Sequence, residues 1–196
     1  ESYISPEAAM LDELQEKYNV IFIVSGTNYD KGTFAGQKII GSPADSINSI
    51  VVNAVARNGE PASYTRRGQV LSFFKKPDIS SYGGENTTEG VRVCTPLGQD
   101  TMSGTSVAAP WITRKVAFLI EVLGFSREVA KALIVDSAAA WDDTGNDPKA
   151  SMLVGHGVVP THINDVVHSK DIEIKLIIDT VSKDYDTYTY ILPVPT

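Results

Sequence analysis

The hydrophobic and polar positions at the start of the chain predict a helix followed by a strand. Ser5, Pro6 and Glu7 form a helix start, with an N-cap hydroxyl, a first-turn proline and an acid facing the helix dipole. The apolar residues after them are spaced three or four apart, like one buried helical face: Ala8, Leu11, Leu14 and Tyr18. Residues 20–24 form a continuous apolar run, which is typical of a parallel strand covered on both faces. The strand leads into Ser-Gly-Thr-Asn at 25–28, at the carboxyl end, where open α/β sheets place their ligands.

Strand and helix patterns then alternate along the chain. A second buried strand is predicted within residues 47–56, and residues 58–90 are typical of loops with short strands. A short strand is predicted at 91–94, then a long helix over 103–123 and another helix from Ser126 onward. This order predicts an α/β fold, with a parallel sheet flanked by helices.

The pattern changes near residue 168. From there, apolar residues alternate with polar ones, which is typical of half-exposed antiparallel strands: Ile172, Ile174, Leu176, Tyr188, Tyr190 and Leu192. The sequence therefore predicts two units. Residues 1–167 form the α/β part, and residues 168–196 begin an appended β-rich unit.

Composition limits the classes of function. The 196 residues are 42% hydrophobic and 21% charged, with a net charge of -7, like an ordinary soluble domain. The chain has no basic cluster of the kind that nucleic acid requires and no apolar run near the ~18 residues of a membrane span. Cys94 is the only cysteine, which excludes an intrachain disulfide and favours a reducing compartment such as the cytoplasm. No cysteine and histidine spacing suits zinc, so no metal site is predicted.

Ser106 is the candidate for covalent chemistry. It lies in Gly-Thr-Ser-Val-Ala-Ala-Pro at 104–110, at the start of the long predicted helix. The free N–H groups and positive dipole end of a helix start favour the negative charge that develops when a serine attacks a carbonyl. Such serines are also common helix caps, so the local pattern leaves both readings open.

Six segments in one order decide between these readings. The run at 104–110 resembles the serine signature Gly-Thr-Ser-x-Ala-x-Pro of the subtilases, the subtilisin-like serine proteases of peptidase family S8. Five other segments resemble further motifs of that family, in its order and at its spacings: the strand and Asn at 21–28, Ser-Pro-Ala at 42–44, 63–68, Lys-Pro-Asp-Ile at 76–79, and Gly-His-Gly at 155–157. The resemblance covers roughly residues 1–167.

The resemblance implies a serine endopeptidase that acts on polypeptides. Ser106 would be its nucleophile, and Asn28 would supply the side-chain donor of the oxyanion hole. The residues implied in substrate binding are Ser25, Gly26, Thr27, Ser42, Pro43 and Thr105. The resemblance also implies that Pro43 follows a cis peptide bond and that Asp78 is structural. Calcium is common in the family, but no loop matches a calcium site clearly, so no cofactor is assigned.

The sequence departs from the family in two places near these residues, a run of four residues and a single residue. After the signature the family has His-Val-Ala-Gly, whereas this chain has Trp-Ile-Thr-Arg at 111–114, which places Arg114 where glycine is usual. Thr27 also stands where the family has glycine. Substrate preference therefore cannot be transferred from the family to this chain.

The family's Asp and His motifs have no counterpart in this sequence, because its three histidines all follow Ser106. We therefore expect the polypeptide alone to be inactive and to need an N-terminal part of the same protease domain, or a dimer contact through an open strand edge. The alternative is a pseudoprotease that binds peptides or regulates without catalysis. An α/β-hydrolase is excluded, because Ser106 lacks the flanking glycines of a nucleophile elbow.

Overall fold

The computed structural model of the chain describes residues 4–29, 39–68, 71, 74–138, 148–168, 175–178 and 189–191. Its elements follow in the order α1 (Pro6–Tyr18), β1 (Ile23–Ser25), β2 (Ile50–Val55), β3 (Ile79–Tyr82), β4 (Val91–Thr95), β5 (Gly98–Met102), α2 (Thr105–Ala117), the π-helical turn η1 (Phe118–Val122), α3 (Arg127–Asp136), α4 (Pro148–Val154) and α5 (Asn164–Val167). Helix α1 is followed by the strands β1 to β5 and then by the other helices, so among the described residues strands and helices do not alternate as the sequence predicts.

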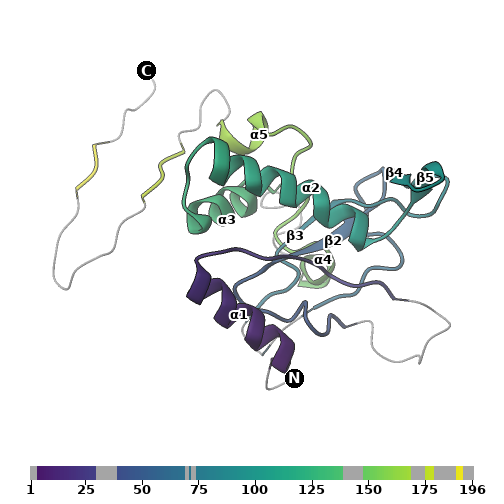
Figure 1. The fold of residues 1–196 in the computed structure, drawn as a ribbon, viewed down its shortest axis with the longest axis horizontal. Coiled ribbons are helices and arrows are strands. Elements are labelled where there is room, and N and C mark those ends of the chain that lie inside the picture. Colours follow the sequence, from purple (N-terminus) through teal and green to yellow (C-terminus); the bar gives the residue numbers. More distant parts are fainter. Residues whose placement is uncertain are drawn as a thin grey trace.

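A three-stranded parallel sheet lies at the centre of the fold, in the order β1-β2-β3. All six residues of β2 are buried. Figure 1 shows α2 running across one side of this sheet, with α1 on the other side. The main core lies between the sheet and helices α2 and α3, and it includes Val52, Ala54, Ile112 and Ile134. The predicted parallel sheet flanked by helices is confirmed.

Helix α1 begins where its sequence predicts, but Tyr18 of its predicted buried face is 60% exposed. Ser5 is the N-cap and accepts a hydrogen bond from the Ala8 N–H, and Asn19 ends the helix with a left-handed φ of 51°. Asp12 fastens the helix to the segment before β2, because its carboxylate accepts hydrogen bonds from the N–H groups of Ile47 and Asn48, each at 2.9 Å. The packing of α1 therefore fixes where β2 begins.

Other elements differ from their predicted form. The first strand is found at Ile23–Ser25, at the end of the apolar run, and the predicted 103–123 helix consists of α2 followed by η1. Strand β3 was not distinguished from the sequence because Ser80 and Ser81 are polar, although both are buried. β4 and β5 pair as an antiparallel hairpin apart from the parallel sheet, and Figure 1 shows the hairpin projecting from it.

The β-rich unit predicted for 168–196 lies largely outside the described residues, and the described positions 175–178 and 189–191 carry no strand. Within the described part of the chain, no helix is both long enough and apolar enough to cross a membrane.

A buried ion pair joins the starts of β2 and β3. The Lys76 Nζ lies 2.6 Å from the Asp78 carboxylate and 2.9 Å from the Ser49 carbonyl oxygen, and the lysine is fully buried. Asp78 also accepts a 2.7 Å hydrogen bond from the Val51 N–H. Burial lowers the pKa of Lys76, and the neighbouring carboxylate of Asp78 opposes that shift. Asp78 thus has the structural surroundings that the Lys-Pro-Asp motif implies.

Candidate active site

Ser106 lies in the first turn of α2, with an exposed side chain beside the buried Thr105. No residue of the preceding loop caps this helix with its side chain. Instead the Asn28 Oδ1 accepts hydrogen bonds from the Thr105 N–H at 3.0 Å and from the Thr105 hydroxyl at 2.9 Å. The structure therefore brings together Ser106, Thr105 and Asn28, although 77 residues of sequence separate Asn28 from Thr105.

Two hydrogen-bond donors beside the serine hydroxyl have no acceptor among the described residues: the Asn28 Nδ2 and the Ser106 backbone N–H. Gly104 separates them, with a φ of +150°. A Cβ at Gly104 would lie 3.0 Å from the Asn28 Nδ2 and 3.2 Å from the Ser106 Oγ. An anion at this place would meet both donors and the positive end of α2, which is the arrangement that stabilises an oxyanion.

Tyr64 connects the two segments that carry these donors. Its carbonyl oxygen accepts a 2.6 Å hydrogen bond from the N–H of Tyr29, the residue after Asn28. Its hydroxyl donates to the Gly84 carbonyl at 2.5 Å, and the carbonyl of the adjacent Gly83 accepts the Gly104 N–H at 3.1 Å. Burial raises the pKa of Tyr64 to about 12, so the hydroxyl stays a donor at neutral pH. Sequence reasoning missed this role, because the Tyr64 hydroxyl bonds to Gly84, which lies 20 residues away in sequence.

Asn28 is also held through its backbone. It forms an isolated antiparallel bridge with Thr65, and its carbonyl oxygen accepts a 3.1 Å hydrogen bond from the Arg66 Nε. These contacts leave the side-chain amide of Asn28 exposed on the side of Ser106.

Gly26 has no room for a side chain. Its N–H donates to the Val52 carbonyl at 2.8 Å, and a Cβ there would come within 1.9 Å of the Asn53 Oδ1. Asn53 is fully buried, and its Nδ2 donates to two carbonyl oxygens at 2.7 Å, those of Arg66 and Leu153. Its Oδ1 has no hydrogen-bond partner, so the glycine backbone is what packs against it. The contact between the Gly26 backbone and the Asn53 Oδ1 therefore fixes how the chain continues into Thr27 and Asn28.

Thr27 adopts a left-handed backbone, with a φ of 66°, which β-branched residues rarely do. Its hydroxyl donates a 2.6 Å hydrogen bond to the Gly26 carbonyl. The backbone conformation is therefore one that suits the family's glycine, and the threonine is tolerated beside Asn28 at a cost in strain.

We expect the Thr27→Gly variant to be more stable than Thr27→Ala by on the order of 1 kcal/mol, since only alanine retains a Cβ in the left-handed region. Both variants lose the same hydroxyl, so their comparison isolates the backbone. Urea unfolding of the two proteins measures the difference. Equal midpoints with equal slopes would contradict the strain at this residue.

The other residues implied in substrate binding are distributed unevenly. Ser25 ends β1 and is half-buried, two residues before Thr27. The Ser42–Pro43 peptide is cis, and the Ser42 hydroxyl donates a 2.9 Å hydrogen bond to Glu7 of α1. None of the hydrogen bonds between described residues joins Ser42 or Pro43 to Ser106, so their role in substrate binding stays a prediction.

The three histidines lie away from the start of α2. The His156 Nδ1 lies 2.9 Å from the Asp78 carbonyl oxygen, and His168 follows the end of α5. His162 lines a pocket against Trp111 and Lys115, farther along α2. Over the described residues, no group of three or more His, Cys, Asp or Glu side chains is arranged to hold a metal ion.

Comparison with known proteins gives relatives of one kind. The chain is 27% identical to pyrolysin of Pyrococcus furiosus in an alignment 192 residues long. The alignment covers 79% of this chain and 13% of pyrolysin. It is 28% identical to the subtilisin-like serine protease Pen ch 13 of Penicillium rubens, with 60% of this chain and 27% of that protein covered. The chain thus spans about a quarter or less of these curated relatives.

Solved structures show the same fold. The prenylagaramide maturation protease PagA matches with a TM-score of 0.59 and 20% identity, covering 79% of this chain and 52% of that one. A protease of Pseudoalteromonas arctica matches with a TM-score of 0.63 and 17% identity, covering 85% and 48%. The model of the subtilase family matches residues 2–157. With these residues matched, the chain belongs to the subtilase family.

Proposed function

We propose that this chain supplies the nucleophile and the oxyanion hole of a serine endopeptidase, with Ser106 as nucleophile and Asn28 as the side-chain donor. The observation that carries the proposal is the pair of unengaged donors on either side of Gly104, next to an exposed serine hydroxyl at a helix start. A structural cap alone needs the acceptor oxygen of Asn28, but it leaves no use for the Nδ2 beside the hydroxyl.

In this proposal the Ser106 Oγ attacks the carbonyl carbon of a peptide bond while a histidine takes the hydroxyl proton. The carbonyl oxygen becomes an oxyanion, which accepts hydrogen bonds from the Asn28 Nδ2 and the Ser106 N–H. Collapse of the intermediate breaks the C–N bond, and the histidine gives the proton to the leaving amine. Water then hydrolyses the ester on Ser106 by the same steps.

The histidine and its aspartate partner come, in this proposal, from sequence outside this chain. Two observations support this. The three histidines of the chain lie beside β3, along α2 and after α5, and the chain spans 52% and 48% of the two solved structures. The polypeptide alone would then be inactive, because no base accepts the Ser106 proton.

A fluorophosphonate probe, which modifies only activated serines, tests the proposal. We expect the chain alone to be labelled no more than its Ser106→Ala variant. The complete protease domain, that is, the chain continuous with the segment bearing the Asp and His motifs, should be labelled at Ser106 and should cleave casein. Strong labelling of the chain alone, or casein cleavage by the complete domain carrying Ser106→Ala, would contradict the proposal.

A second candidate is a pseudoprotease that binds peptides without cleaving them. It is favoured by the departure from the family on α2, where Arg114 replaces glycine and both Arg114 and Trp111 are exposed. The same experiment separates the two candidates. A folded complete domain that binds a peptide inhibitor but is not labelled at Ser106 would establish the pseudoprotease.

A further inference from the structure

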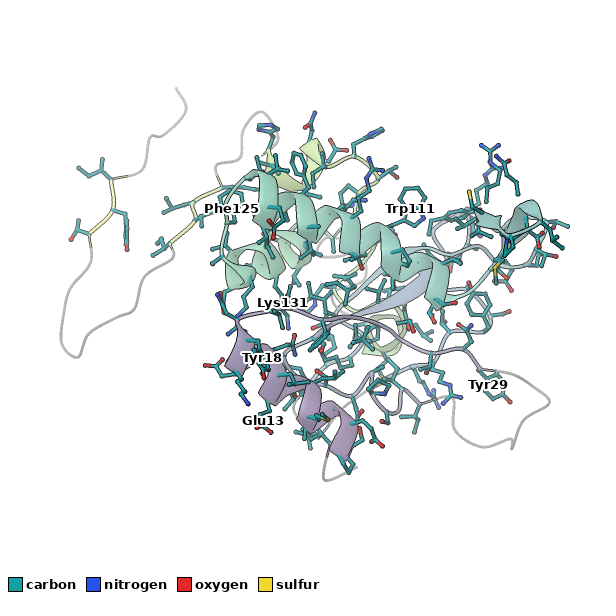
Figure 2. All side chains as sticks on the ribbon, in the orientation of Figure 1. Glu13, Tyr18, Tyr29, Trp111, Phe125 and Lys131 are labelled. Carbon is teal, nitrogen blue, oxygen red and sulfur yellow. The ribbon has the colours of Figure 1, made fainter. Side chains whose placement is uncertain are left out.

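A pocket of about 530 Å³ lies between α2 and the segment at residues 161–163. One side is formed by Trp111, Arg114 and Lys115 of α2 with Phe118 of η1, and His162 lies on the other side. Figure 2 shows the Trp111 ring on the side of α2 that faces away from β2. The walls are thus aromatic, and every ionisable group among the lining residues is basic.

No described residue neutralises the two cations of this pocket. Lys115 is only 9% exposed, yet neither its side chain nor that of Arg114 makes a hydrogen bond or an ion pair with any described residue. Burial lowers the pKa of Lys115, and the positive charge of Arg114 lowers it further. The other buried lysine, Lys76, is by contrast paired with Asp78. Because buried charges are almost always paired, these side chains favour an anionic occupant of the pocket.

The pocket adjoins the face of α2 that carries the nucleophile. Ser106, Pro110, Arg114 and Phe118 follow at four-residue spacing, which aligns them in one row, and all four are exposed. The row from Ser106 to Arg114 is about 12 Å long at 1.5 Å per residue. A segment that brings a base to Ser106 from outside this chain would approach the same face of α2 that carries Arg114.

We propose that this pocket binds the carboxylate of an Asp or Glu side chain from the segment that completes the protease domain beside α2. The inference rests on the proposed function for the existence of that segment. Arg114 offers a planar fork of donors and Lys115 a point charge, which together suit one carboxylate, and the Trp111 and Phe118 rings would cover its aliphatic stem.

The identity of the occupant follows from position as well as charge. The match covers 52% and 48% of the two solved chains, and the proposed function places the rest of such a fold in sequence outside this chain. The exposed row on α2 is aligned with the nucleophile, and the family's small residue is replaced there by Arg114. An acidic side chain on the completing segment would compensate that replacement. A partner without an acid at this point would bury two uncompensated cations.

The Lys115→Met variant is expected to shift the melting temperature in opposite directions in the chain alone and in the complete domain. In the chain alone it removes an unpaired buried charge, so we expect the melting temperature to rise by about 2–4 °C, the shift typical of 1 kcal/mol in a protein of this size. In the complete domain the same variant leaves a buried carboxylate without its partner, and the melting temperature should fall. A shift of the same sign in both forms would overturn the inference.

Zero-length carbodiimide coupling identifies the occupant, since it joins an amine only to a carboxylate in contact with it. We expect a peptide crosslinked through Lys115 to an Asp or Glu of the completing segment in the complete domain. The Lys115→Arg variant keeps the charge but not the reactive amine, so it should lose the crosslink and keep the melting temperature. A domain that is labelled at Ser106 but forms no Lys115 crosslink would overturn this inference while leaving the proposed function intact.

Discussion

Replacing Asn28 by aspartate is expected to lower the kcat of the complete protease by about 10²–10³-fold, with KM changed little. The range is that for loss of one oxyanion-hole donor, and it was established on another protease of this family. The aspartate retains an oxygen for the Thr105 N–H and hydroxyl, which Asn28 now accepts at 3.0 and 2.9 Å. It replaces only the Nδ2 group that faces the Ser106 hydroxyl across Gly104.

This exchange separates the two uses of the Asn28 side chain. The helix cap survives, and a negative charge at the start of α2 is favourable to the helix dipole, so the melting temperature should hold. Thr105→Val is the matched control, because it removes one of the two cap hydrogen bonds and leaves both oxyanion donors in place. We expect it to reduce stability more than kcat. Unchanged kcat in Asn28→Asp would show that the Nδ2 does not contact the transition state.

Replacing Lys76 by methionine is expected to lower the free energy of unfolding by about 3–5 kcal/mol, the usual cost of removing one partner from a buried ion pair. The Lys76 Nζ is fully buried between the Asp78 carboxylate and the Ser49 carbonyl oxygen. Without it, Asp78 keeps the Val51 N–H and a distant Lys131 at 3.9 Å. Urea unfolding measures the loss, and the change should appear in the midpoint rather than in the slope.

Two further variants determine the cause of this loss. Lys17→Met alters an exposed lysine of α1 and should change stability by less than about 0.5 kcal/mol. The double variant Lys76→Met with Asp78→Leu removes both charges, so it should recover part of the loss. If the double variant were less stable than Lys76→Met alone, the structural value of Asp78 would lie in its hydrogen bond to Val51 and not in the pair.

Local patterns allowed much of the fold to be predicted from the sequence. The caps at Ser5 and Ser126 and the apolar run of β2 act within a few residues, so they can be recognised without the tertiary structure. Strand β3 could not be predicted, because Ser80 and Ser81 are buried by neighbours distant in sequence. The appended β-rich unit remains a prediction.

The candidate site divides in the same way. Ser106 and Asn28 were indicated by family motifs, and their mutual geometry agrees with the roles proposed for them. Contacts between distant segments determine the left-handed backbone of Thr27, the hydrogen bond from the Tyr64 hydroxyl to Gly84 and the burial of Lys115. No local sequence pattern predicts such contacts. A lysine in a helix is predicted to face solvent unless its neighbours in the fold are known.

The cap that Asn28 provides to α2 bears on how the history of this chain is interpreted. Its Oδ1 holds the Thr105 peptide, so natural selection for folding alone would preserve asparagine here after catalysis had been lost. Retention of Asn28 among related proteins is therefore weak evidence that they cleave peptides. Ser106 has no such second duty among the described contacts, because its exposed hydroxyl caps nothing. Substitution of Ser106 among related proteins, rather than of Asn28, would indicate that selection for cleavage had been lost.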